Sequence, residues 1–172
     1  MPDDICQLPD KLDPWVASSL LQKAIRRGDE ALAQVAALRL FQMRGKGIWR
    51  RLLTIAFEDV GIANPGLLLD TASLASDPRL REMIGTEIEV LQNLSKQLAA
   101  AAKDRSADYL FCGATKLENA QRFDAQLGQE CGSKWPEIAM ERERSLIERA
   151  VALLKICSHT GEREKNGLSS SF

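Results

Sequence analysis

Apolar residues recur along this chain at the three- and four-residue spacing of amphipathic helices. The first such stripe contains Ala17, Leu20, Leu21, Ala24 and Ile25. It follows Asp13-Pro14, which is typical of an N-cap residue followed by proline at the first helical position, and Gly28 comes directly after it. These signals predict a helix that begins at Pro14 and ends before Gly28.

The next two segments predict a central helix and a one-sided helix. Asp29 is a candidate N-cap for a helix to about Arg44, which Gly45 ends, and the mostly apolar residues after Glu30 predict burial on most sides. A third helix is expected to begin after Gly47 and to end at Gly61. Its apolar face is predicted to contain Trp49, Leu52, Leu53, Ala56 and Val60.

Asn64-Pro65 and Asp77-Pro78 predict the starts of a fourth and a fifth helix by the same cap chemistry. The fifth helix is predicted to be long and to end at about Lys103. Its apolar stripe is expected to comprise Leu80, Ile84, Ile88, Leu91, Leu98 and Ala102. Gly85 lies inside this stretch and costs about 1 kcal/mol relative to Ala, so it is a candidate site for a bend or a break.

A sixth helix is predicted from about Ser106 to about Leu127, and residues 128–133 have the composition of a loop. Pro136 is expected to open a last helix. The apolar stripe of that helix would contain Leu146, Ile147, Ala150, Val151, Leu154 and Cys157. From Thr160 onward no periodic apolar pattern remains, which predicts a disordered tail.

The pattern as a whole predicts an all-α, single-domain bundle of about six or seven helices. We expect an N-terminal extension over residues 1–12, a helical domain over 13–158 and a tail over 159–172. A chain of 172 residues is long enough for one core, and its low aromatic content of 5% favours helices over a β-sandwich. The chain contains no signal-peptide pattern and no apolar window of membrane-spanning length, and its four scattered cysteines form no CxxC, so we expect a cytoplasmic protein without a membrane partner.

Charge is unevenly distributed along the chain. Residues 20–56 contain eight basic and only two acidic side chains, whereas residues 57–95 contain seven acidic and two basic ones. Such polarity can attract an anionic polymer or a charged partner to one face. Alternatively, the basic and acidic faces of the bundle neutralise each other.

Glu58 and Asp59 are candidates for acid–base chemistry, but their spacing argues against it. Consecutive positions of an α-helix point about 100° apart, so the two carboxylates are not expected to share a proton. They also lie at a predicted helix C-terminus, where negative charge is unfavourable. We therefore interpret them as structural ion-pair residues, compensated by Arg26, Arg27 or the helix N-terminus after Asn64, with a catalytic or ligand-binding role as the alternative.

The basic residues include a candidate surface for DNA or for a protein partner, made of Arg26, Arg27, Lys46, Arg50 and Arg51. Trp49 lies next to Arg50 in the sequence. Proteins that bind single-stranded nucleic acid often combine arginine with an aromatic ring. Because Trp49 also belongs to the apolar stripe of its helix, burial of the indole in the core is the competing interpretation.

No motif for a metal, cofactor or nucleophile is found. Cys157 and His159 lack further ligands at a zinc-site spacing, and their adjacency is not the geometry of a catalytic cysteine site. Gly45-Lys46-Gly47 lacks both the upstream glycine and the following Ser or Thr of a Walker A motif. We therefore predict a protein with no cofactor, no metal and no enzymatic activity.

A set of residues within 18–65 forms a fairly specific pattern. It consists of Ser19-Leu20, Lys23-Ala24-Ile25-Arg26, Asp29, Arg50-Arg51-Leu52, Ile55-Ala56, Glu58-Asp59-Val60-Gly61 and Ala63-Asn64-Pro65. In these positions, and more weakly at Ser106, Ala107 and Tyr109, the chain resembles the C-terminal helical domain of the replication-associated recombination protein A family. These are AAA+ ATPases related to clamp loaders and to the Werner-helicase-interacting ATPase. No counterpart of their ATPase module is found in these 172 residues.

The resemblance implies a clamp-loader-collar-like domain, which in that family holds subunits together while the ATPase acts on DNA. It implies a non-enzymatic module that forms a homo-oligomer or docks onto a protein of DNA replication, recombination or repair. Direct DNA binding through the basic face is the second hypothesis. An enzyme on a helical scaffold, with Glu58, Asp59 and the arginines around a polar pocket, is the third.

Overall fold

The structure, a computed structural model, describes residues 12–114, 134–145, 148–153 and 155–156. All regular secondary structure in these ranges is helical, without a strand, which confirms the predicted all-α bundle. Its elements are α1 (Pro14–Arg27), α2 (Glu30–Arg44), α3 (Gly47–Ile55), η1 (Ala56–Val60), η2 (Gly61–Ala63), α4 (Pro65–Ser76), α5 (Pro78–Ile84), α6 (Glu87–Ala100), α7 (Ser106–Ala114) and α9 (Trp135–Met140). No helix in these ranges is both long and apolar enough to cross a bilayer.

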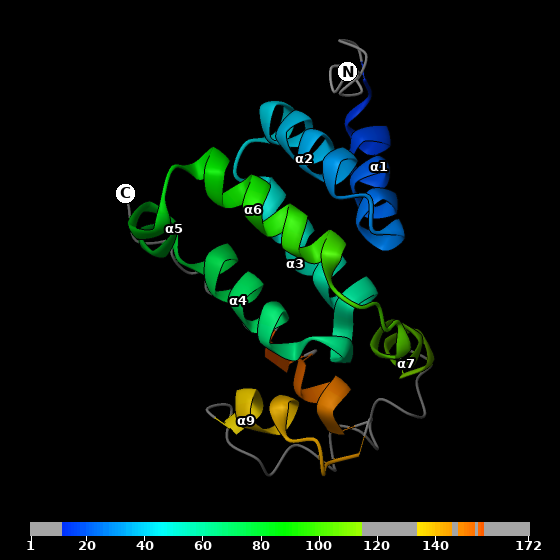
Figure 1. Cartoon of the computed structure of the whole chain (residues 1–172). Helices are drawn as coiled ribbons and strands as arrows, with labels where there is room; N and C mark the ends of the chain where they lie inside the picture. The colour runs from blue at the N-terminus through cyan, green and yellow to red at the C-terminus, as the bar shows by residue number, and fades with distance from the viewer. Residues whose placement is uncertain (1–11, 115–133, 146–147, 154, 157–172) are drawn as a thin grey trace, which may run out of the picture.

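Helices α1 and α2 form an antiparallel hairpin, and α6 packs along the other side of α2 (Figure 1). The predicted caps are confirmed: Asp13 accepts from the N–H groups of Trp15 and Val16, and Asp29 accepts from that of Leu32. Between its neighbours, α2 presents mainly small side chains. Its fully buried residues are Ala33, Ala36, Ala37 and Leu40, so the hairpin and α6 can approach closely.

The third helix was predicted to continue to Gly61, but its α-helical geometry ends at Ile55. It changes at Ala56 into one π-helical turn, η1, and then into a short 3-10 turn, η2, before Asn64 caps α4. Gly61, with a φ of 51°, allows the sharp change of direction. The π turn alters which side chains face the interior, because a residue added to a helical turn rotates those that follow it.

The predicted fifth helix is in fact two helices. Gly85 ends α5, and Thr86 begins α6 with a capping box in which its side chain accepts from the N–H of Glu89 while the Glu89 side chain accepts from the N–H of Thr86. The predicted buried stripe is therefore wrong at its centre. Ile84 and Ile88 are 61% and 45% exposed, and Ala102 is exposed as well.

The structure describes the C-terminal helices only in part. Helix α7 begins at Ser106, as expected, whereas residues 115–133, which include the predicted remainder of that helix and the loop, lie outside the described residues. The predicted single helix after Pro136 is interrupted, because α9 ends at Met140 and residues 141–145 are not helical, whereas 148–153 and 155–156 are. The predicted stripe residues Leu146, Ile147, Leu154 and Cys157 lie outside the described residues, as do 1–11 of the N-terminal extension and the whole tail.

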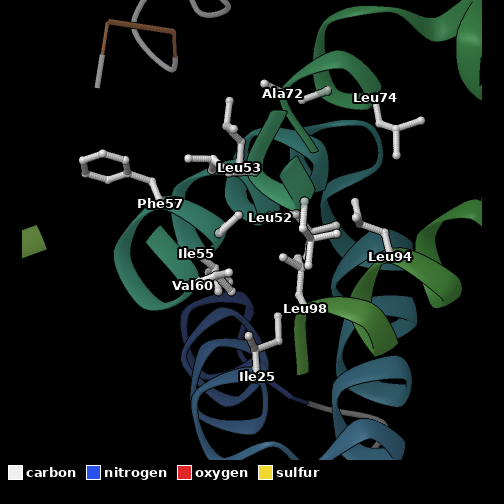
Figure 2. Close-up of a cluster of buried hydrophobic side chains, with 14 of the residues drawn as sticks. Ile25, Leu52, Leu53, Ile55, Phe57, Val60, Ala72, Leu74, Leu94 and Leu98 are labelled. Carbon is white, nitrogen blue, oxygen red and sulfur yellow. The ribbon is translucent and has the colours of Figure 1, made fainter. Parts of the chain in front are cut away.

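The core lies where α3 and η1 meet α1, α4 and α6 (Figure 2). Ile25 of α1, Leu52 of α3, Val60 of η1 and Leu98 of α6 point toward one another there and are fully buried. Leu53 and Phe57 lie on another side of this cluster (Figure 2). Most residues from Leu52 to Ile62 are thus buried at the centre of the fold.

Candidate functional site

A buried carboxylate lies at the junction of α1, η1 and the start of α7. Asp59 has no exposed surface, and its Oδ1 lies 2.6 Å from Nε of Arg26 and 3.5 Å from Nε of Arg105. Both arginine side chains keep about a third of their surface exposed. The ion pairs therefore extend from the interior toward the surface. We call these residues, with Gln22, Arg51 and Glu58, the Asp59 cluster.

Gln22 joins the two neighbouring carboxylates of this cluster. Its Nε2 donates to Oε2 of Glu58 at 2.6 Å and to Oδ2 of Asp59 at 3.2 Å, and its Oε1 accepts from Arg51 at 2.7 Å. The expectation that Glu58 and Asp59 diverge assumed α-helical geometry. Within the π turn, one amide group bridges them instead, so they converge on a shared donor without contacting each other directly.

The segment between α6 and α7 closes over the same site. The N–H of Asp104 donates to the backbone oxygen of Asp59 at 3.0 Å. Burial lowers the pKa of Lys103, whose Nζ donates to the oxygen of Ala99. The hydrogen bond from Arg105 to Asp108, 2.6 Å long, raises the pKa of Arg105.

The Asp59 cluster connects elements and leaves few of its groups available for chemistry. Both carboxylate oxygens of Asp59 already accept hydrogen bonds, from Arg26 and from Gln22. Among the described residues, no group of three or more His, Cys, Asp or Glu side chains is arranged to hold a metal ion. The arrangement is that of a charged link between three parts of the chain.

The structure divides the predicted basic surface into two kinds of residue. Arg26 and Arg51 donate into the Asp59 cluster. Arg27, Lys46 and Arg50 are exposed, and no ion pair is found for them within the described ranges. These three residues lie at the end of α1, in the turn before α3 and on α3.

Trp49 is buried, with 1% of its surface exposed, and is unavailable for stacking on a nucleic acid base. Its Nε1 donates to Oε1 of Glu87 at 2.6 Å, and the guanidinium of Arg81 lies 4.6 Å from the centre of its ring. Arg81, itself only 2% exposed, also pairs with Glu87 at 3.3 Å and donates to the oxygen of Leu74. We call Trp49, Arg81 and Glu87 the Arg81 cluster. The sequence analysis did not find it.

An apolar groove opens next to this second cluster, between α4, α5 and α6. It has a volume of about 380 Å³. Its lining residues are Asp70, Ser73 and Leu74 of α4, Leu80 and Ile84 of α5, and Val90, Asn93, Leu94 and Gln97 of α6. Next to Ile84, which is 61% exposed, lies Met83, which is 82% exposed, and we call this pair the apolar ridge. The apolar spacing of residues 80–102 predicted Ile84 in a buried stripe, so the ridge was not expected.

Comparison with known proteins adds no relative to these observations. Neither a protein-family model nor a curated protein sequence matches this chain.

Proposed function

We propose that this chain is a non-enzymatic helical module that works by binding a protein, either a second copy of itself or a component of the DNA replication and repair machinery. The observation that carries the proposal is the apolar ridge beside the groove. Large apolar side chains exposed next to a concave apolar surface are typical of protein interaction sites. The choice of replication and repair as the setting rests on the resemblance of residues 18–65 to a collar domain.

The two polar clusters support a binding role over a catalytic one. The carboxylates of the Asp59 cluster are engaged by arginine and amide groups, and the Glu87 carboxylate accepts from Trp49 and pairs with Arg81. General acid–base catalysis requires a carboxyl group that can reach a substrate. Carboxylates that are engaged in structural pairs are not free to exchange a proton with a substrate. A scaffold fixed by such pairs suits a module that binds a protein.

The test compares the full chain with a variant in which the ridge is polar, Met83→Ser/Ile84→Ser. Both proteins are tagged and purified from the native host, and their particle mass is measured by size-exclusion chromatography with light scattering. We expect the wild-type chain to form a larger particle, containing further copies or a second protein, and the variant to lose it. The control is Val16→Ser/Met140→Ser, which removes two apolar side chains of about half exposure elsewhere.

Circular dichroism must show that all three proteins remain helical. A wild-type chain that stays a monomer without a bound protein at tens of micromolar would contradict the proposal. So would a ridge variant that keeps the same partners as the wild type.

Direct binding to DNA is the second candidate function, because Arg27, Lys46 and Arg50 are exposed and have no ion pair among the described residues. Phosphate contacts release counterions, so the affinity for DNA would fall steeply as the salt concentration rises. An Arg27→Gln/Lys46→Gln/Arg50→Gln variant would then bind more weakly. Absence of binding by the wild-type chain to single- and double-stranded DNA at low salt would eliminate this candidate.

A further inference from the structure

The groove between α4, α5 and α6 has the internal organisation of a site for a helix. On α6 its lining residues follow the spacing i, i+3, i+4, i+7, and on α4 they follow i, i+3, i+4. Each helix thus presents one continuous side to the groove over one to two turns. The seven-residue step from Val90 to Gln97 corresponds to about 10 Å along α6, which is two turns of a guest helix.

The floor and the rim of the groove differ in polarity. Leu74, Val90 and Leu94 form a buried floor, and Figure 2 shows Leu74 and Leu94 on the same side of the core cluster. The remaining residues of α4 and α6 in the lining are polar and exposed, namely Asp70, Ser73, Asn93 and Gln97. An amphipathic guest helix would bury its apolar stripe on such a floor and keep its polar flanks at the rim.

The groove contains one carboxylate, and the segments that form it carry more acidic than basic side chains. Asp70 is the one charged residue in the lining, and no ion pair or hydrogen bond is found for its side chain within the described residues. Glu82 of α5, Glu89 of α6 and Asp77, between α4 and α5, are exposed as well. Of the basic residues of the three helices, Arg81 is buried and Lys96 lies 3.9 Å from Glu30, which leaves Arg79 exposed without an ion pair.

From these observations we propose that the groove binds a cationic amphipathic helix of another protein. The guest carries two or three apolar side chains at helical spacing and Lys or Arg on its flanks. Its apolar side chains lie on Leu74, Leu94 and Ile84, and one of its cations pairs with Asp70. This inference rests on the proposed function and specifies the chemistry of its partner.

The test measures binding of a fluorescent peptide probe to the full chain by anisotropy. The probe is an 18-residue helix with Leu at i, i+4 and i+7 and Lys on both flanks. Two control probes are used, one with Glu in place of every Lys and one with the same composition in scrambled order. We expect the cationic probe to bind at least about tenfold more tightly than either control.

Two substitutions in the protein locate the site. Ile84→Asp places a charge on the ridge and Asp70→Lys reverses the charge of the rim, and both positions are exposed, so folding should be retained. Each is expected to weaken binding of the cationic probe at least about tenfold. The matched controls are Val16→Asp and Glu143→Lys, at exposed positions outside the groove, and they should bind the probe as the wild type does.

Equal binding of the scrambled probe, or unchanged binding by Ile84→Asp and Asp70→Lys, would overturn the inference. If no probe binds but the wild-type chain forms dimers that Ile84→Asp abolishes, the groove takes a second copy. The cationic-helix inference then fails while the proposed function stands. If no probe binds and the wild-type chain purified from its native host is a monomer without a partner, both fail.

Discussion

Arg26 and Asp59 join the last turn of α1 to the π turn after α3 through a contact of 2.6 Å between Nε and Oδ1. The carboxylate has no exposed surface, whereas 38% of the arginine side chain is exposed. The pair therefore connects a buried negative charge to a positive charge that is partly in contact with solvent. Arg105 also forms an ion pair with Asp59 and the amide of Gln22 donates to it, so two cations and one neutral donor compensate the buried charge.

Replacement of Asp59 tests how much this compensation contributes. We expect Asp59→Asn to lower the free energy of unfolding by about 1–3 kcal/mol, because Arg26 and Arg105 would lose their negatively charged ion-pair partner, although the partial exposure of both arginines moderates the loss. Chemical denaturation measures the change. Arg27→Gln, at the neighbouring exposed arginine, should change the same quantity by less than about 0.5 kcal/mol. Similar effects at the two positions would contradict a special role for Asp59.

Gly61 is predicted to tolerate no side chain. A Cβ atom added there would lie 2.6 Å from the backbone oxygen of Asp104, and its φ of 51° disfavours any other residue. Gly61→Ala should therefore lower the free energy of unfolding by about 1–3 kcal/mol. Gly47→Ala is the matched control, because nothing lies within 4 Å of an added Cβ there and its φ is not positive, and it should be neutral or stabilise by up to about 1 kcal/mol.

Two substitutions of Glu87 in the Arg81 cluster separate the contribution of its hydrogen bond to stability from that of its charge. Glu87→Ala removes the acceptor of the buried indole N–H of Trp49 and the ion-pair partner of Arg81, and we expect a loss of about 1–3 kcal/mol in stability. Glu87→Gln keeps an oxygen for the indole and should cost less. Thermal and urea unfolding of the two variants would show the order. A Gln variant as unstable as the Ala variant would indicate that charge alone matters.

The capping box of α6 predicts a pH dependence. The pKa of Glu89 lies below its ordinary value of 4.5, because the hydroxyl and the N–H of Thr86 donate to its carboxylate. A lowered carboxyl pKa contributes stability that is present above the unfolded pKa and is lost as the pH falls through the folded pKa. We expect the start of α6 to become less stable below about pH 4.5. Hydrogen exchange of the backbone amides in its first turn would measure this change. Thr86→Val removes the hydroxyl donor and should bring the pKa of Glu89 back toward 4.5, which an NMR titration would measure.

Helix starts were predictable because they depend on neighbouring residues. Asp13-Pro14, Asn64-Pro65 and Asp77-Pro78 each specify a cap and a first turn within a few positions, and the structure has helices at all three. The break before α6 was also available in the sequence, since Thr86 and Glu89 have the spacing of a capping box. The apolar periodicity of residues 80–102 concealed it.

The polar clusters could not be predicted in the same way, because their partners are distant in the sequence. Trp49 meets Glu87, and Gln22 meets Glu58, only after the bundle has formed. The π turn adds a second difficulty, since it changes the direction of Glu58 and Asp59 relative to an α-helix. The apolar residues of α3 showed that this segment lies in the core, and Arg26 was correctly placed among the candidate partners of Asp59.

The burial of Arg81 has a consequence for the outer side of α5. This helix has only seven residues and would be expected to fray on its own. The buried side chain of Arg81 connects α5 to Trp49, Glu87 and the end of α4. These contacts hold in place the helix that contains Met83 and Ile84. A surface that is already ordered before it meets its ligand loses little conformational entropy on association.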